Sequence, residues 1–350
     1  MTCIDMSDVA SDIALVKNNA VVGARIASHL CHLESEPSGE QAGMVVVGGA
    51  NLDVICRPNR PLLIGDSNIG HVTYRCGGVG RNMAEAARRS GARVNFVSAV
   101  GQDMSATHLL SSLKQVGVNT HHITRSADHD TASFVAVQNA ERDLHVAVNA
   151  TRITEDMLTP ASLDAPLRRL LPTAKLVAVD CNLTTDALAA VCDAASAAGV
   201  PVWVETTSTT KSVRITSLLH LVDYISPNVD EARAILAHHQ GAATQGPREL
   251  AVTLLSCGVR KAALVHDAEG VAVAARQPGG MPSIFHQPAI PVARLVSTNG
   301  AGDTFAGAAA AALSLGATLK QAALHGITAA GATVSTMEAV ASSIQPWCNQ

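Results

Sequence analysis

Short apolar runs alternate with stretches of helical character along most of this sequence. The apolar runs occupy residues 44–48, 94–100, 176–179, 200–204, 224–226 and 262–265. The helical stretches, many of them rich in alanine, occupy residues 82–90, 106–116, 185–198, 231–237 and 247–256. Alternation of this kind predicts an α/β fold with a mostly parallel sheet that carries helices on both faces.

Two segments interrupt the alternation. Residues 52–75 and 131–148 lack helical periodicity and have a β-type composition, as in Ser133–Val137. We expect them to form a small separate sheet, which would act as a lid over the carboxyl edge of the main sheet. Because an exposed sheet edge can pair with another chain, a homodimer through the lid is a further expectation.

Residues 1–43 differ from the rest of the chain. Residues 11–33 have the pattern of one amphipathic helix, and residues 34–43 form a polar linker. The expected organisation is therefore an N-terminal helix and linker at 1–43, followed by one α/β domain at 44–350.

Composition excludes several functional classes. The 25 basic and 29 acidic residues give a net charge of -4 without a basic run, so nucleic acid is not an expected partner. The eight cysteines form no C-x-x-C pair, which disfavours a zinc site and a disulfide framework. No apolar run approaches the roughly 20 residues that span a bilayer, and acidic residues interrupt the first twenty positions. We therefore expect a cytoplasmic protein without a membrane partner.

The most informative motif is Gly300-Ala301-Gly302-Asp303, which opens an alanine-rich helix. Unpaired N–H groups at a helix start attract anions, and glycines let a phosphate approach the backbone closely. Asp303 in the first turn could accept a hydroxyl proton beside such an anion site. The alternative is that Asp303 only caps the helix.

A second glycine-rich motif, Gly77-Gly78-Val79-Gly80-Arg81-Asn82, precedes another helix. Its glycines permit close approach of a ligand, and the Asn82 amide can donate and accept bonds to sugar hydroxyls. Met83 stands where the dinucleotide-binding fingerprint has its third glycine, so that fingerprint is absent. The alternative is a tight turn with Asn82 as a helix cap.

Two further motifs follow predicted strands. Asn51 and Asp53 come after the first strand, where open α/β sheets bind ligands, and Asp53 could bind a diol or only shape a turn. Asn228 and Glu231 stand three residues apart at a helix start, where they could hold the water shell of Mg²⁺ or form a capping box. No P-loop motif occurs in the sequence, which excludes that class of nucleotide-binding protein.

Taken in this order and spacing, the four motifs resemble the ribokinase-like (PfkB) carbohydrate kinase family over residues 44–345. The resemblance implies a three-layer α/β/α sandwich with a β lid, a sugar-type substrate under the lid, and ATP with Mg²⁺. Its implied catalytic residues are Asp303, as the base, with Gly300, Ala301 and Gly302. Its implied substrate-binding residues are Asn51, Asp53, Gly77, Gly78 and Asn82. Its implied cofactor-binding residues are Thr298, Gly300, Gly302, Asn228 and Glu231, of which Asn228 and Glu231 would hold Mg²⁺ through water.

A narrower resemblance is to the pseudouridine kinase branch of the family. It rests on residues 77–85, on Val179–Leu183 with its Asp-x-Asn-Leu, and on residues 204–212 with their Lys-Ser. It implies that ATP phosphorylates the ribose 5′-hydroxyl of pseudouridine. Asn182 would then line the substrate pocket, unless it is only a turn residue. Lys211 would neutralise phosphate charge as part of the cofactor site, unless it is only a solvated surface lysine.

The N-terminal segment carries a separate resemblance. Residues 11–27 are similar to the last helix of pseudouridine-5′-phosphate glycosidase, which cleaves the product that such a kinase would make. This implies that the chain is the kinase half of a fused protein, or a relative that lost the glycosidase body. The alternative is an unrelated amphipathic helix.

Some positions depart from the family. Ser297 and Asn299 replace an Asp and a Thr that often stand there and help to build a monovalent-cation site, so the sequence leaves K⁺ dependence open. Residues 148–150 are also atypical. Two rival hypotheses remain: a kinase of the same scaffold for another nucleoside or a free sugar, and a binding protein without catalysis.

Overall fold

A computed structural model of the chain describes residues 43–348 apart from 140–143 and 238–243. All of these residues belong to one compact unit, Gln41–Gln350. The helix expected at 11–33, and the linker expected at 34–43 except for Gly43, lie outside the described residues.

The described residues form a main sheet of nine strands in the order β13-β12-β11-β10-β9-β8-β1-β4-β5. All strands from β11 to β5 in this order pair in parallel, and only β12 and β13 are antiparallel. The bounds are β1 Met44–Val47, β4 Val94–Val100, β5 Ile123–Arg125, β8 Leu176–Asp180, β9 Val202–Glu205, β10 Tyr224–Ile225, β11 Ala262–Asp267, β12 Gly270–Ala275 and β13 Ser283–Pro288. The predicted mostly parallel sheet is confirmed.

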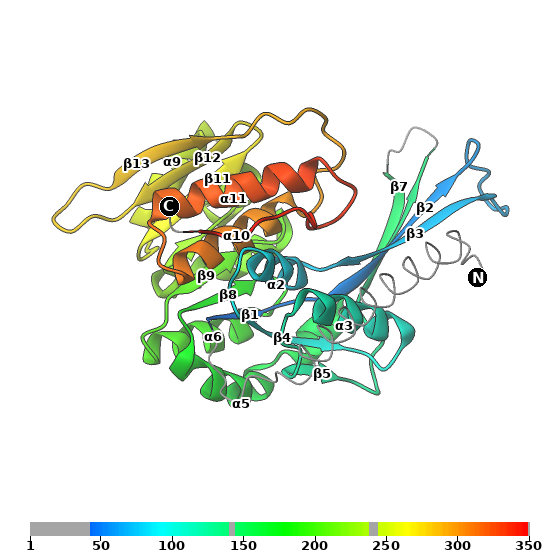
Figure 1. Cartoon of the computed structure of the whole chain (residues 1–350), viewed down its shortest axis with the longest axis horizontal. Helices are drawn as coiled ribbons and strands as arrows, with labels where there is room; N and C mark the ends of the chain where they lie inside the picture. Colours follow the sequence, from blue (N-terminus) through cyan, green and yellow to red (C-terminus); the bar gives the residue numbers. More distant parts are fainter. Residues whose placement is uncertain (1–42, 140–143, 238–243, 349–350) are drawn as a thin grey trace, which may run out of the picture. The chain divides into compact units, whose positions relative to one another are not determined.

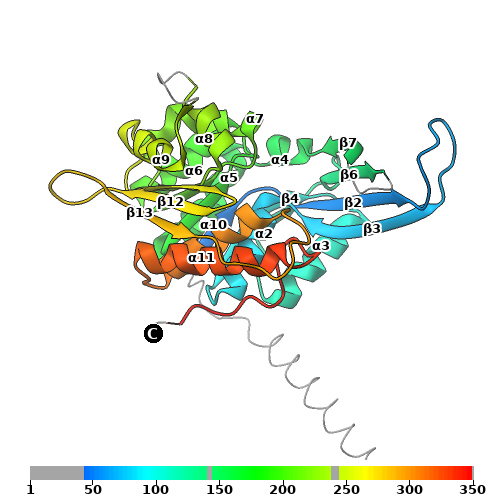
Figure 2. The same cartoon turned by 90° about the horizontal axis from the view of Figure 1, so that it is seen from above.

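Apolar side chains cover both faces of this sheet, as expected for buried parallel strands. On β1, Met44 and Val46 join the core on one face, and Val45 and Val47 join the core on the other. The first face carries α2 Val79–Arg89, α3 Met104–Val116, α10 Ala301–Ser314 and α11 Leu319–Val334 (Figure 2). The second carries α4 Arg152–Met157, α5 Pro160–Leu170, α6 Thr185–Ala197, α8 Val229–Ile235 and α9 Pro247–Ser256. The three-layer α/β/α sandwich is confirmed.

The lid is a second sheet of four strands in the order β3-β2-β6-β7. Its bounds are β2 Asn51–Pro58, β3 Gly70–Gly77, β6 Ser133–Gln138 and β7 Leu144–Ala150. Both predicted lid segments therefore take part in it, and its strands extend away from the main sheet (Figure 1). Only residues 48–50 separate β1 from β2, so a central strand of the main sheet leads directly into a central strand of the lid.

Several apolar side chains of the lid are exposed, among them Val72 and Tyr74 on β3 and Val148 on β7. The expected homodimer through the lid stays a prediction. Cys56, Cys76, Cys181, Cys192 and Cys348 are free thiols. No helix of the described residues combines the length and apolarity that a bilayer crossing needs.

Candidate active site

The start of α10 offers unused backbone donors. Gly300 is its N-cap with φ +77°, a left-handed conformation, and a Cβ placed on it would lie 2.1 Å from the Ala339 carbonyl oxygen. The Ala301 N–H donates to the Thr298 carbonyl oxygen at 3.3 Å. In the described part of the chain, the N–H groups of Gly302 and Asp303 meet no acceptor. Free N–H groups at a helix start are what an anion site requires.

Asp303 bonds across the site, to another helix. Its Oδ2 accepts a hydrogen bond of 2.8 Å from the Asn82 amide of α2, and the two residues are 221 positions apart in the sequence. Burial raises the pKa of Asp303 to about 6, the Asn82 bond lowers it, and the charges of Asp180, Glu231 and Asp53 raise it. The N-cap of α10 is Gly300, so Asp303 is not the residue that caps this helix. Its pKa suits a carboxylate that takes up a proton near neutral pH.

The amide of Asn82 is oriented by its neighbour Arg81. The Arg81 guanidinium donates to Asn82 Oδ1 at 2.9 Å, which leaves the amide nitrogen for Asp303. Arg81 is buried and forms an ion pair with buried Glu85 one helical turn later. No role for Arg81 or Glu85 was predicted from the sequence. Their i, i+4 spacing as an oppositely charged pair was the available signal.

The second glycine motif packs against the chain between β1 and β2. Gly78 has φ +97°, and a Cβ on it would lie 2.6 Å from the Gly49 carbonyl oxygen. A Cβ on Gly80 would lie 2.7 Å from the Gly48 Cα. These two glycines therefore let the start of α2 approach residues 48–51, which places Asn82 near the end of β1. Their assignment to the substrate stays a prediction.

Asp180, at the end of β8, is a central residue to which the sequence analysis gave no role. Its fully buried carboxylate accepts from the N–H groups of Gly49 and Asn182, both at 2.9 Å. Burial raises its pKa, and these hydrogen bonds lower it. A Cβ on Gly48 would lie 2.3 Å from Asp180 Oδ2, so the glycine is required there. The Asp-x-Asn at a strand end was the signal for this residue.

Asp53 faces the same region from the lid strand β2. Its Oδ1 accepts a 2.5 Å hydrogen bond from the Asn51 amide. Burial raises its pKa to about 6, against the bond from Asn51 and the charges of Arg75 and Arg81. A Cβ on Gly77 would lie 2.6 Å from Asp53 Oδ2, so Gly77 makes room for this carboxylate. Asp53 also acts electrostatically on Asp303, which brings the two predicted carboxylates into one site.

Asn228 and Glu231 form the capping box that the sequence allowed. Asn228 Oδ1 accepts from the Glu231 N–H at 2.9 Å, and Glu231 Oε2 accepts from the Asn228 N–H at 3.0 Å. The Thr206 hydroxyl donates to the same Glu231 oxygen at 2.6 Å. The other Glu231 oxygen has no hydrogen bond to a described residue. No group of three or more His, Cys, Asp or Glu in the described chain could hold a metal ion by itself.

Two more polar groups at this edge were missed by the sequence analysis. Glu205, at the end of β9, accepts a 2.6 Å bond from Ser226, and burial together with the charges of Glu231 and Asp303 raises its pKa well above its usual range. His266, on β11, has a buried Nε2 without a partner among the described residues. A Cβ on Gly302 would lie 3.6 Å from that Nε2, so the ring borders the start of α10. A histidine within a strand gives no local signal of such a position.

Asn182 and Lys211 form a hydrogen-bonded pair next to Asp180. The Lys211 ammonium, from the short helix α7 Thr209–Ser212, donates to Asn182 Oδ1 at 2.7 Å. Asn182 also lies near Gly49, because a Cβ on that glycine would be 3.4 Å from its amide nitrogen. Lys211 is only half-buried, but it is paired in the site and is not a freely solvated lysine.

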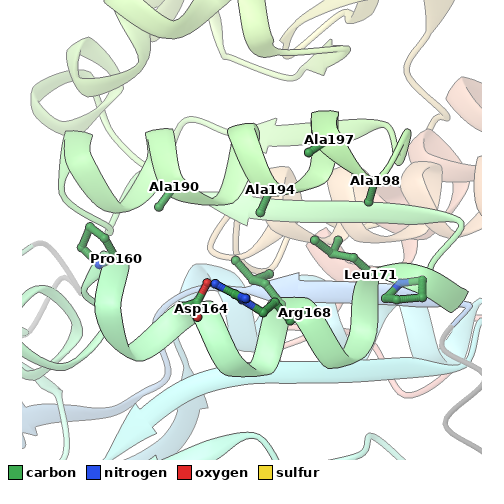
Figure 3. Close-up of a pocket in the computed structure, with 10 residues that line it drawn as sticks. Pro160, Asp164, Arg168, Leu171, Ala190, Ala194, Ala197 and Ala198 are labelled. Carbon is green, nitrogen blue, oxygen red and sulfur yellow. The ribbon is translucent and has the colours of Figure 1, made fainter.

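A separate hollow lies between α5 and α6 (Figure 3). Its volume is about 400 Å³, and alanines of α6 and residues of α5 line it, including Ala190, Ala194 and Arg168. It shares no residue with the cluster of polar groups at the carboxyl edge of the sheet. The polar cluster, and not this hollow, is therefore the candidate active site.

The model of the pfkB family of carbohydrate kinases matches residues 41–346. Pseudouridine kinase from Escherichia coli is 31% identical over 212 residues, which are 61% of this chain and 65% of that protein. Pseudouridine kinase from Arabidopsis thaliana is 32% identical over 191 residues, which are 55% of this chain and 50% of that protein. The chain thus spans less than two thirds of the length of either relative.

The fold also has a counterpart among solved structures. A carbohydrate kinase from Agrobacterium tumefaciens superposes with a TM-score of 0.73 at 26% identity, covering 86% of this chain and 94% of that one. Since the family match extends over nearly all of the described residues, the chain belongs to the pfkB family of carbohydrate kinases.

Proposed function

We propose that this protein is an ATP-dependent pseudouridine kinase, which phosphorylates the ribose 5′-hydroxyl to give pseudouridine 5′-phosphate. The observation that carries the proposal is the pair of Asp303 and Asn82 beside the free N–H groups of α10. In this arrangement a base and an anion site share one helix turn, as phosphoryl transfer to an alcohol requires.

Asp303 is the proposed base. Its carboxylate accepts the proton of the attacking hydroxyl, and Asn82 holds the carboxylate in place through the 2.8 Å bond. The N–H groups of Gly302 and Asp303 donate to the transferring phosphoryl group, where negative charge accumulates. ATP supplies that group when it is bound, and exposed Thr298 borders the same loop.

Magnesium would be held by few protein atoms. Asn228 and Glu231 are already joined in a capping box, but one Glu231 oxygen stays available. Mg²⁺ in phosphoryl-transfer sites commonly keeps several waters and binds one or two carboxylates together with phosphate oxygens. Asn228 and Glu231 therefore fit a Mg²⁺ ion that is held through water. The negative charges of Asp180, Glu231 and Asp53 around Asp303 also favour a bound cation.

Asp53, Asn51 and Asn182 are the proposed sugar-binding residues. Asp53 comes from the lid, and Asn182 comes from the main sheet, so the substrate would lie between the two sheets. The choice of pseudouridine is supported by the two pseudouridine kinases among the relatives. The resemblance of residues 11–27 to a glycosidase that acts on pseudouridine 5′-phosphate supports the same substrate.

The substrate is tested by measuring ATP consumption with pseudouridine, uridine, adenosine and ribose in parallel. We expect kcat/KM for pseudouridine to exceed that for each of the others by at least about tenfold, which corresponds to about 1.4 kcal/mol of transition-state binding. Equal or better turnover of another nucleoside or of ribose would assign the chain to that substrate. No turnover with any of them would favour a binding protein without catalysis.

Activity and stability are expected to change in opposite directions with pH. Since the pKa of Asp303 is about 6, kcat/KM should rise as the pH increases through 6 and then level off. Because the pKa of Asp303 is higher in the folded protein (about 6) than in the unfolded chain (3.8), the fold is more stable when Asp303 is protonated. This contribution to the free energy of unfolding is complete below pH 3.8 and is lost as the pH rises through about 6. Urea unfolding of the wild type and of Asp303→Asn isolates this contribution as the difference between them. A difference that is independent of pH between 4 and 7 would contradict the assignment.

A further inference from the structure

Another hollow lies at the edge of the main sheet opposite the candidate active site. Its volume is about 360 Å³, and its walls include Tyr224 and Ala262, where β10 and β11 begin, and Leu313 near the end of α10. The active-site groups lie at the other ends of the same elements, at His266 of β11 and Gly300 before α10. About 13 Å of extended strand separates Ala262 from His266. The hollow and the candidate active site are therefore separate places in the fold.

Three cationic side chains line this hollow. They are Arg260, Lys261 and Arg276, and none of the described lining residues is acidic. The nearby Asp223 carboxylate lies 3.4 Å from the Lys261 ammonium and 4.0 Å from the Arg260 guanidinium. Among the described residues no carboxylate pairs with Arg276, whose guanidinium donates to the Val259 carbonyl oxygen at 3.0 Å. Three cations beside one carboxylate leave two positive charges in excess.

The backbone around the hollow also favours an anion. Helix α11 begins at Leu319, which lines the hollow, and the N–H groups of Leu319 and Lys320 have no acceptor in the part of the chain that the structure describes. Unpaired N–H groups at a helix start attract negative charge. The adjoining end of α10 opposes this little, because its last carbonyl oxygens, those of Ala311, Ala312 and Leu313, already accept hydrogen bonds from the turn that follows.

The size and the remaining walls of the hollow indicate a small organic ligand. A volume of about 360 Å³ is near the lower end for small-molecule sites, which span about 300–1,000 Å³. Ala275 and Leu313 add apolar surface, and Gln277 adds an amide. A phosphate monoester carries a charge of about −1.5 to −2 at pH 7, which matches the two positive charges in excess. Guanidinium and ammonium groups are both suited to phosphate oxygens.

We infer that this hollow binds a small phosphate monoester, such as a sugar phosphate. Arg260, Lys261 and Arg276 donate to the phosphate oxygens, since each has N–H donors beyond those used in its present contacts. The free N–H groups at the start of α11 face the same charge. The apolar walls contact the organic part of the ligand. The inference goes beyond the proposed kinase reaction, because no residue of the hollow belongs to the candidate active site.

The test is a calorimetric titration of the full chain with ribose 5-phosphate in a phosphate-free buffer. The double variant Arg260→Gln/Lys261→Gln should raise the dissociation constant at least about tenfold, because it removes two charged hydrogen-bond donors. Lys261→Arg keeps the positive charge and should bind within about threefold of the wild type. Lys175→Gln, which removes an exposed lysine before β8 at the same edge of the sheet, is the matched control and should match the wild type.

Two further ligands identify the group that is bound. Ribose lacks the phosphate, so any affinity for it should be the same in the wild type and in the double variant. Inorganic phosphate lacks the organic part, so it should bind the wild type more weakly than ribose 5-phosphate, and equal affinity would overturn the assignment to an ester. The melting temperature of each variant should equal that of the wild type, because the substituted side chains lie at the surface.

Ribose 5-phosphate could also enter the candidate active site, and Asp303→Asn distinguishes the two places. The inference predicts that Asp303→Asn keeps the affinity that the double variant loses. It is overturned if the wild type does not bind ribose 5-phosphate, if the double variant binds it like the wild type, or if Lys175→Gln loses as much affinity as the double variant. All of these titrations measure binding without turnover, so failure of the proposed pseudouridine kinase activity would leave their result unchanged.

Discussion

Asp303→Asn should lower kcat by about 10²–10⁴-fold, the usual contribution of a positioned general base. The substitution keeps the shape of the side chain and an oxygen that can accept from Asn82, but it removes the basic carboxylate. The N–H groups at the start of α10 stay in place, so the dissociation constant for ATP should change only a few-fold. Steady-state kinetics with pseudouridine and a direct ATP titration measure the two quantities.

Asp230→Asn is the matched control for this substitution. Asp230 is an exposed carboxylate of α8 next to Glu231, and among the described residues it pairs only with Arg233, at 3.4 Å. Its substitution removes the same charge from the same end of the sheet, and kcat should stay within about twofold of the wild type, because exposed ion pairs contribute little. If both variants lose activity equally, or if Asp303→Asn retains full turnover, the proposed base is wrong.

Gly300→Ala should destabilise the fold by several kcal/mol, in addition to abolishing most activity. The left-handed φ of +77° alone costs a non-glycine residue about 1–3 kcal/mol. The new methyl group would also lie 2.1 Å from the Ala339 carbonyl oxygen, a backbone atom that cannot move away without displacing its own segment. Chemical unfolding measures the loss in the free energy of unfolding.

Gly302→Ala is the stability control two residues further on. Its Cβ would meet only the His266 ring, at 3.5 Å, and its backbone has no left-handed strain. We expect its free energy of unfolding to lie within about 1 kcal/mol of the wild type. A Gly300→Ala variant as stable as Gly302→Ala would show that the start of α10 adapts freely, which this geometry does not allow.

Most of the fold could be predicted from local patterns. The alternation of apolar runs and helical stretches is a direct result of burying parallel strands between two helix layers, as at Met44–Val47. The lid segments were recognisable because they lack the 3.6-residue period. The start of α10 was also recognisable, since Gly300 stands before a long run of alanines. Such features depend on neighbours within a few residues, which a sequence displays.

The residues that the sequence did not reveal act over long separations. Asp180 and Gly49 are 131 positions apart, and only the fold brings them to 2.9 Å. The burial of Glu205 and the unpartnered Nε2 of His266 likewise depend on elements from distant parts of the chain. Nothing in the residues around either one indicates what will pack against it.

Asn228 and Glu231 illustrate a different limit. An Asn followed three residues later by Glu satisfies both a capping box and a water-mediated magnesium site, because both uses need oxygen atoms at a helix start. The structure contains the capping box, which uses only one of the two Glu231 carboxylate oxygens. A local pattern cannot separate two roles that require the same atoms.

The direct passage from β1 into β2 links the lid sheet to the proposed catalytic groups by a very short connection. Only residues 48–50 separate the two strands, and the N–H of Gly49 is bonded to Asp180 while its carbonyl oxygen accepts from the Arg81 N–H. Rotation of the lid must change the torsion angles of these three residues, so it pulls on both of those bonds. If substrate binding at Asp53 rotates the lid, the same three residues would pass the displacement to the start of α2, which holds Asn82.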